Sequence, residues 1–230
     1  MPTEFDRYAA QYRALLRDPI RERFAPGSAF FAQRKWELLQ AFLERRGVPI
    51  QSARWLDVGC GQGELLRLGK PCFAEVAGCD LSREMLSAAA DLNVTLQPAP
   101  DRLPFPAGQF HLVTAVCVYH HVASDDMRRR LTSEIHRVLE PGGIFCIVEH
   151  NPLNPVTRLI VRRTPVDQDA RLLTAAESHA LLQAGGFHVL GREFFLYLPE
   201  RLYHAAPFVE ACMKKVPLGG QYAVFGEKRG

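Results

Sequence analysis

The sequence lacks the features that would place it in a membrane or an oxidising compartment. No apolar run approaches the roughly 18 residues that a membrane-spanning helix needs. The opening residues, MPTEFDRYAA, contain neither a positively charged segment nor an apolar core, so we predict no signal peptide. These absences predict a cytoplasmic protein with no membrane partner.

Metal-binding and nucleic-acid-binding patterns are also missing. The six cysteines form no CxxC pair and no cluster with histidine at zinc-finger spacing, and we therefore predict no metal site. Most of the cysteines stand in apolar stretches, where a reduced thiol behaves as a small hydrophobic group. The net charge of +3 is too small to imply nucleic-acid binding by itself. We expect a small-molecule partner, no nucleic acid, and a monomer or homodimer.

The chain of 230 residues has the length of one domain with additions. Its first fifty residues contain two amphipathic patterns, EFDRYAAQYRALL and FFAQRKWELLQAFLERRG, with apolar residues three and four apart. We predict that residues 1–48 form an N-terminal helical cap over the site and that residues 49–230 form the main domain.

From residue 53 the pattern changes to short apolar runs that alternate with helical stretches at about 64–69, 82–91 and 124–139. This alternation is typical of an α/β fold with a mostly parallel sheet and helices on both faces. The last two apolar runs, FHVLGREFFLYL and GGQYAVFGEK, are predicted to be antiparallel partners at one edge. The segment between them, 198–219, is predicted to be a flap or lid.

A glycine-rich turn follows the first predicted strand in RWLDVGCGQGELL. Glycines at 59, 61 and 63 let a ligand approach the backbone at the carboxyl end of that strand. Glu64 stands where a dinucleotide fingerprint needs its third glycine, which argues against a nicotinamide cofactor. Asp80, at the end of the second strand in GCDLS, can accept hydrogen bonds from both hydroxyls of a ribose. The ligand is therefore expected to carry a nucleoside.

Four segments, LDVGCGQGELL, GCDLSREMLSAA, LPFPAGQFHLV and VLEPGGIFCIVEH, resemble the ordered motifs of class I S-adenosylmethionine-dependent methyltransferases of the small-molecule branch. The resemblance is close over residues 50–150. It implies a Rossmann-like fold whose seven-stranded sheet has the order 3-2-1-4-5-7-6. It also implies transfer of the methyl group of S-adenosylmethionine to a small organic acceptor, through an oxygen, nitrogen, carbon or sulfur atom, with release of S-adenosylhomocysteine.

The same resemblance assigns cofactor contacts. Asp57 and the turn would surround the methionine end, Asp80 would hold the ribose, and Leu81 and Met85 would pack near adenine. Ala99 and Pro100 depart from the family, and proline has no N–H to offer adenine, so Asp101 is expected to take over its amino group. The predicted cofactor-binding residues are Asp57, Gly59, Cys60, Gly61, Gly63, Asp80, Leu81, Met85, Asp101 and Cys117.

Three histidines are the candidate catalytic residues. His120 and His121 follow the fourth strand in VCVYHHV, where either is a candidate base or hydrogen-bond partner for the acceptor. The alternative is that they cap the strand end or fill the lip. His150 ends the fifth strand, next to a loop rich in Asn and Pro, and the choice there is between a substrate contact and a structural role.

The acceptor pocket is expected to come from the N-terminal helices and from two insertions, 150–173 and 198–219. Four arginines in or near the first insertion are candidates for binding a carboxylate or phosphate, with a solvated helix face as the alternative: Arg158, Arg162, Arg163 and Arg171. Two other functions stay open, an S-adenosylmethionine-binding protein without catalysis and a nicotinamide-dependent oxidoreductase.

Overall fold

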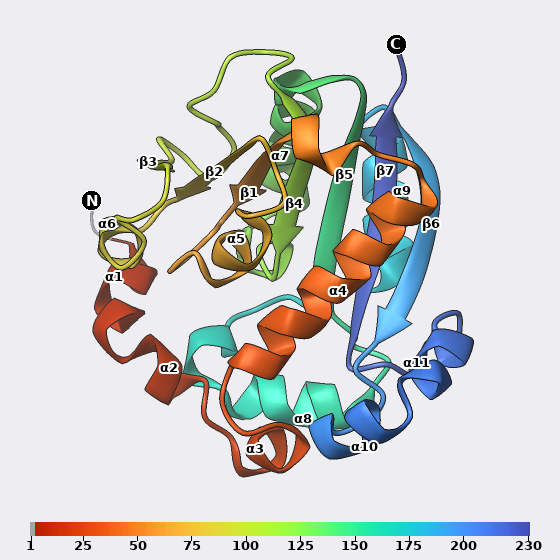
Figure 1. Ribbon diagram of the computed structural model, residues 1–230. Helices are drawn as coiled ribbons and strands as arrows, with labels where there is room; N and C mark the ends of the chain where they lie inside the picture. Colours follow the sequence, from red (N-terminus) through yellow and green to blue (C-terminus); the bar gives the residue numbers. More distant parts are fainter. Residues whose placement is uncertain (1–2) are drawn as a thin grey trace.

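Seven strands form a single sheet in the computed structural model, which describes residues 3–230 (Figure 1). The strands are β1 (Arg54–Val58), β2 (Glu75–Asp80), β3 (Val94–Leu96), β4 (Phe110–Val116), β5 (Leu139–His150), β6 (Phe187–Phe195) and β7 (Gln221–Lys228). Their spatial order is β3-β2-β1-β4-β5-β7-β6. All neighbours are parallel except β7, which is antiparallel to both β5 and β6. The predicted fold and strand order are confirmed.

Helices cover both faces of this sheet, as expected for strands that are apolar on both sides. One core cluster lies under α4 (Ala29–Arg45), α5 (Glu64–Gly69) and α6 (Arg83–Ser87). The other lies under α7 (Asp125–Val138) and α9 (Ala175–Ala184). In Figure 1, α4 crosses the near face of the sheet and α7 lies behind it.

Helix α4 is part of the core. Phe42 stacks on Phe225 of β7 with ring centroids 3.6 Å apart, and Trp36 stacks on Trp55 of β1 at 6.0 Å. The side chains of Phe42, Trp36 and their two partners are all buried. The N-terminal region thus contributes a layer of the fold in addition to covering the site.

The segment before α4 is more broken than its sequence pattern predicts. The expected helix over residues 4–16 consists of α1 (Glu4–Tyr8), the 3-10 turn η1 (Ala9–Gln11) and α2 (Tyr12–Leu15), and α3 (Pro19–Phe24) follows. Thr3 and Asp6 form a capping box at the start of α1. Asp6 also accepts a hydrogen bond from the Ser82 hydroxyl at 2.7 Å, which ties α1 to the start of α6.

The carboxyl ends of the parallel strands lie beside several short elements, at the bottom of Figure 1. These are η3 (Tyr119–His121), α8 (Pro155–Arg163), η4 (Pro165–Asp167), α10 (Glu200–Ala205) and α11 (Pro207–Met213), while η2 (Ile50–Ser52) precedes β1. The irregular loop predicted after β5 is short because Asn154 caps α8 and Pro155 occupies its first position. The predicted flap contains α10 and α11.

A buried ion pair joins that flap to α4. Arg34 donates to Glu210 at 2.6 Å and to the hydroxyl of Tyr203 at 2.6 Å. Glu210 also accepts from the backbone N–H groups of Tyr197 and Leu198.

Within residues 3–230, no helix is long and apolar enough to cross a membrane, and all six cysteines are free thiols.

Candidate functional site

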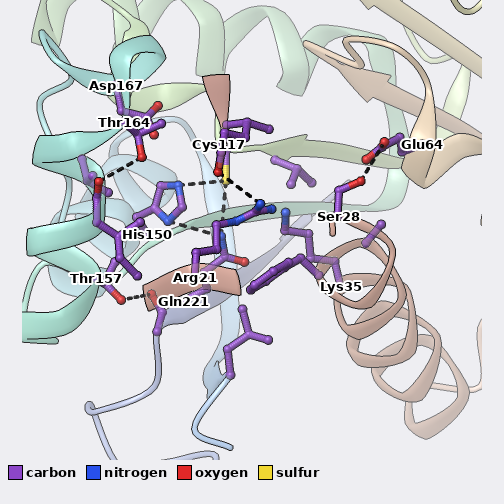
Figure 2. Close-up of a pocket in the computed structure, with 18 of the residues that line it drawn as sticks. Arg21, Ser28, Lys35, Glu64, Cys117, His150, Thr157, Thr164, Asp167 and Gln221 are labelled. Atoms are coloured by element: carbon purple, nitrogen blue, oxygen red, sulfur yellow. Dashed lines mark hydrogen bonds between the residues drawn. The ribbon is translucent and has the colours of Figure 1, made fainter. Parts of the chain in front are cut away.

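A cavity of about 490 Å³ opens at the carboxyl ends of β1, β4 and β5 (Figure 2). Its volume lies within the range of small-molecule sites. Helices α2, α3 and α4 border it on one side, and α8 and η4 border it on the other. Chain segments that are far apart in the sequence therefore share this cavity.

Eight of the sequence-predicted site residues line the cavity: Asp57, Gly59, Cys60, Gly61, Cys117, His120, His121 and His150. Five others do not: Gly63, Asp80, Leu81, Met85 and Asp101. The structure thus brings the methionine side of the predicted cofactor site together with all three candidate catalytic histidines. The predicted ribose and adenine residues lie outside this space.

The glycines of the turn have different roles. All three have positive φ angles, at +69° for Gly59, +52° for Gly61 and +76° for Gly63. A Cβ on Gly59 would meet Val118 at 2.5 Å, and one on Gly63 would meet Leu92 at 2.5 Å. Around Gly61 a Cβ would meet nothing within 4 Å. Gly61 therefore presents an open backbone to the cavity, whereas Gly63 packs inward as the N-cap of α5.

Asp57 is the acidic group at the base of this turn. It is buried and accepts a hydrogen bond from the Thr114 hydroxyl at 2.6 Å. Thr114 in turn accepts from the indole N–H of Trp55 at 2.9 Å. Burial raises the pKa of Asp57 to about 7, despite the opposing hydrogen bond. A cationic ligand beside Asp57 would favour its charged form, and an amino acid's ammonium group meets this requirement.

Asp80 organises the turn and the helix after β2. It accepts from the N–H of Gly61 at 2.9 Å and from the N–H of Ser82 at 2.8 Å. Burial raises its pKa, against these hydrogen bonds. Met85 is buried in α6. At the start of the same helix, Ser82 and the N–H of Glu84 donate hydrogen bonds to Asp6 of α1. The predicted ribose contact of Asp80 therefore stays a prediction.

Asp101 lies outside the cavity for a clear reason. Its carboxylate accepts a hydrogen bond from Arg130 of α7 at 2.6 Å, and this bond lowers its pKa. The partner on α7 draws the side chain to an ion pair on the surface. The expected contact with the adenine amino group has no support in this arrangement.

His120 is fixed by a buried carboxylate. Its Nδ1 is hydrogen-bonded to Glu149, whose other oxygen accepts from the N–H of Tyr119 at 2.8 Å. Burial opposes the charged form of His120, but the charges of Glu149 and Asp167 outweigh it and raise the pKa well above the ordinary value. Burial likewise opposes ionisation of Glu149, and His120 outweighs it so that the pKa of Glu149 is lowered. The two groups form a coupled buried pair.

Asp167 of η4 reaches both neighbouring histidines. Its Oδ1 lies 3.5 Å from Nε2 of His120 and 3.4 Å from Nε2 of His121. Burial raises the pKa of Asp167, but the two imidazoles outweigh burial and lower it. Burial lowers the pKa of His121, whereas the pKa of His120 is raised. His121 therefore favours its neutral form and His120 its charged form.

His150 belongs to a second polar group, with Cys117 and Gln221 (Figure 2). Its Nε2 lies 3.8 Å from Cys117 Sγ, and the Gln221 amide lies 3.3 Å from its Nδ1. Burial lowers the pKa of His150 to about 4, so it is neutral at physiological pH. The neutral ring can donate or accept a hydrogen bond at the lip of the cavity.

Backbone strain and unpaired polar atoms also gather here. Among residues 3–230, the two non-glycine residues with positive φ are Cys117 at 57° and Leu196 at 61°, and both line the cavity. Such conformations concentrate at functional sites. His120 Nε2 and Gln221 Oε1 are buried without a hydrogen-bond partner from the described chain. Because orphaned buried polar atoms are costly, they indicate groups that a ligand satisfies.

Two cationic side chains from the N-terminal helices line the cavity, and one of them, Arg21, was not anticipated from the sequence. Arg21 of α3 lies over the Phe31 ring at 4.2 Å, and Lys35 projects from α4. Both point toward Cys117 in Figure 2, and neither forms an ion pair within the described chain. Tyr12 of α2 also lines the cavity. The positions of the N-terminal helices in the fold show that these side chains line the cavity.

The four arginines singled out in the sequence do not line the cavity. Arg163 pairs with Asp18 at 3.2 Å, and Arg171 pairs with Asp125 and with Glu177. At least these two are engaged in ion pairs outside the cavity. The arginine and lysine side chains that do line the cavity are Arg21 and Lys35.

Comparison with known proteins identifies the domain that carries this site. Residues 56–147 match the methyltransferase domain family. These residues carry a methyltransferase domain of the class I S-adenosylmethionine-dependent type. This assignment confirms the family resemblance of its motifs and gives S-adenosylmethionine as the cofactor.

Curated relatives of this chain carry names that differ in what those proteins act on. It is 31% identical over 133 residues to the tRNA (carboxymethyluridine(34)-5-O)-methyltransferase of Arabidopsis thaliana, covering 57% of this chain and 32% of that protein. It is 34% identical over 164 residues to the demethylmenaquinone methyltransferase of Symbiobacterium thermophilum, covering 65% and 62%. The chain thus spans about a third of the first relative and about three fifths of the second.

Solved structures support the fold over the whole chain. A chain of the complex between the Trm112 methyltransferase activator and a methyltransferase of Haloferax volcanii has a TM-score of 0.70 at 20% identity, with 100% of both chains covered. An S-adenosylmethionine-dependent methyltransferase from Thermotoga maritima has a TM-score of 0.68 at 16% identity, with 98% of both chains covered. At these sequence identities the structural similarity establishes the fold alone.

Proposed function

We propose that this protein transfers the methyl group of S-adenosylmethionine to a small organic acceptor bound in the cavity and releases S-adenosylhomocysteine. The observation that carries the proposal is that Asp57 and the open backbone at Gly61 share one cavity with His120, His121 and His150. The first pair suits the amino-acid end of the cofactor. The histidines supply polar groups on the acceptor side of the same space.

The residues present fit this cofactor. Asp57 offers a carboxylate for the ammonium group, and Lys35 offers a cation for the carboxylate. When bound, the cofactor supplies an electrophilic methyl group on a sulfonium. Asp80 is the group that we propose for the ribose, beside the contact that Asp6 of α1 makes with Ser82. Leu81 and Met85 would then lie near the base.

The acceptor half of the cavity is mainly apolar. Its wall comes from α8, through Val156, Ile160 and Val161, and from Phe24 and Leu196. This lining favours an apolar or ring-bearing acceptor. We therefore propose that the insertions 150–173 and 198–219 form the acceptor side of the main domain.

Charge adds a second requirement on the acceptor. Arg21 and Lys35 are both cations that face the cavity, whereas the cofactor carries one carboxylate. The remaining cation needs an anionic partner, which we propose to be a carboxylate, phenolate or similar oxygen of the acceptor. The similarity to a demethylmenaquinone methyltransferase supports a ring-bearing acceptor with oxygen substituents.

The protein's own contribution to the reaction would be alignment and proton handling. A largely closed apolar pocket holds the two reactants in line and excludes water. His120, oriented by Glu149, is proposed to face the reacting atom of the acceptor, with His121 and His150 on either side. Their roles as catalytic residues follow from this placement.

The direct test measures S-adenosylhomocysteine release with a panel of phenolic, carboxylate and amine acceptors of matched size. We expect turnover with an apolar ring that carries an acidic oxygen, and Arg21→Ala should raise KM for that acceptor more than for a neutral analogue. Arg158→Ala, an arginine outside the cavity, is the matched control. Equal KM changes for charged and neutral acceptors would remove the proposed role of Arg21.

The same assay decides among other acceptors. Purified tRNA belongs in the panel because some relatives are named tRNA methyltransferases. Turnover of tRNA, alone or with a Trm112-like protein added, would replace the small-molecule proposal. Binding of S-adenosylhomocysteine with no turnover of any acceptor would favour the non-catalytic alternative. We propose the cytoplasm as the place of action, where S-adenosylmethionine would be available.

A further inference from the structure

Three side chains at the acceptor end of the cavity have the spacing of metal ligands. Nε2 of His120, Nε2 of His121 and a carboxylate oxygen of Asp167 lie within 4.8 Å of one another. The two distances to Asp167, 3.5 Å and 3.4 Å, are long for hydrogen bonds, which for N–H···O cluster at about 2.7–3.2 Å. Ligands bound tetrahedrally at about 2.0–2.1 Å stand about 3.3–3.4 Å apart. The two distances to Asp167 fit a shared ion better than direct hydrogen bonds.

The orientation of His120 provides independent support. Its Nε2 is buried and has no hydrogen-bond partner from the described chain, and the residue is 2% exposed. Its other nitrogen is held by Glu149, which the N–H of Tyr119 fixes in turn. A carboxylate on the remote nitrogen is the usual outer support of a metal-binding histidine. His120 Nε2 thus lies 3.5 Å from Asp167 but makes no hydrogen bond within the described chain.

Charge and donor type narrow the ion. Glu149 and Asp167 are two buried carboxylates beside this one point, and a divalent cation would balance both. Two imidazole nitrogens and one carboxylate oxygen suit zinc or iron(II) rather than magnesium or calcium, which prefer oxygen ligands only. All three ligand residues line the cavity, so the remaining coordination positions face the acceptor space.

We propose that His120, His121 and Asp167 bind one divalent transition-metal ion at the acceptor end of the cavity. The sequence predicts no metal site because its cysteines form no CxxC pair and no cluster with histidine at zinc-finger spacing. Asp167 lies close to the two histidines because α8 and η4 carry the chain back along the cavity. Metal binding can be measured without methyl transfer. A negative result for the metal site therefore leaves the proposed methyl transfer untouched, and the reverse also holds.

The test uses the full chain after dialysis against a chelator, with no cofactor present. Titration calorimetry with Zn²⁺ and, under anaerobic conditions, with Fe²⁺ should show one equivalent bound per chain. Asp167→Asn keeps the shape of the side chain and should weaken binding by at least about tenfold. Asp169→Asn, an exposed neighbour in the same loop, is the matched control and should bind as the unmodified chain does.

Co²⁺ provides a readout of the ligands. A nitrogen and oxygen site should give visible absorption without a thiolate charge-transfer band, and His121→Gln should change that spectrum while His188→Gln should not. Binding that is unchanged in Asp167→Asn would overturn the proposal. So would a thiolate band that disappears in Cys212→Ser, or the absence of any stoichiometric binding by the correctly folded chain.

Discussion

The carboxylate of Asp57 accepts a hydrogen bond from Thr114 at 2.6 Å at the base of the glycine turn, and burial raises its pKa to about 7. An ammonium group binds the charged carboxylate and favours that form. Affinity for S-adenosylhomocysteine should therefore be constant above about pH 8 and fall by about tenfold for each pH unit below 7. Calorimetry between pH 5.5 and 8.5 measures this dependence.

The matched variants separate Asp57 from the histidines that titrate nearby. Asp57→Asn should bind more weakly at pH 8 and should lose the part of the pH dependence centred near 7. Asp91→Asn, which alters an exposed carboxylate paired with Arg67, should keep the full dependence. A flat profile for the unmodified chain would contradict the assignment of Asp57 to the ammonium group.

The ion pair between Arg34 and Glu210 should contribute strongly to stability. Glu210→Ala leaves a buried guanidinium without one of its carboxylates and two backbone N–H groups without an acceptor. We expect a loss of about 3 kcal/mol in the free energy of unfolding. Urea denaturation measures it, with Glu44→Ala on the exposed side of α4 as the control. Equal midpoints for the two variants would show that the flap is not held by this pair.

The contact between α1 and α6 should control cofactor exchange. Asp6 accepts from Ser82 and from the N–H of Glu84, and the Ser82 bond is the main cause that lowers its pKa to about 2. Asp6→Ala removes this tie, so S-adenosylhomocysteine should dissociate several times faster. Rapid dilution of a preformed complex measures the rate. Glu4→Ala, on the same helix, should leave it unchanged, and similar rates for both variants would exclude α1 as a cover.

The stack of Phe42 on Phe225 predicts that α4 folds with the main domain. Phe42→Ala should lower the free energy of unfolding by about 3–5 kcal/mol, because both rings are buried. Phe208, which is 69% exposed on α11, is the control and should cost little when replaced by alanine. A separate, earlier unfolding step for the N-terminal region would instead support residues 1–48 as an independent cap.

Local patterns account for the part of the site that the sequence predicts. The turn at Gly59 and Gly61 follows β1, His120 follows β4, and His150 ends β5. Because these three strands are adjacent and parallel, topology alone places the residues at one edge of the sheet. Asp167 and Gln221 escaped prediction because each enters through a crossing of distant elements.

Asp101 shows the opposite case. Its position in the sequence fits an adenine contact, but Arg130 on the next helix forms an ion pair with it. The spacing of residues along the chain does not show that a distant arginine will bind a carboxylate in place of a ligand. Arg21 was missed for a related reason, since an amphipathic helix pattern does not show which of its polar residues face a cavity.

The position of β7 between β5 and β6 has a consequence for synthesis of the protein. Until residues 221–228 leave the ribosome, β5 presents a long apolar edge and β6 lacks its partner strand. Such edges invite pairing with other chains. The nascent chain is therefore most exposed to aggregation just before its last strand emerges, and chaperone demand should peak at that stage of translation.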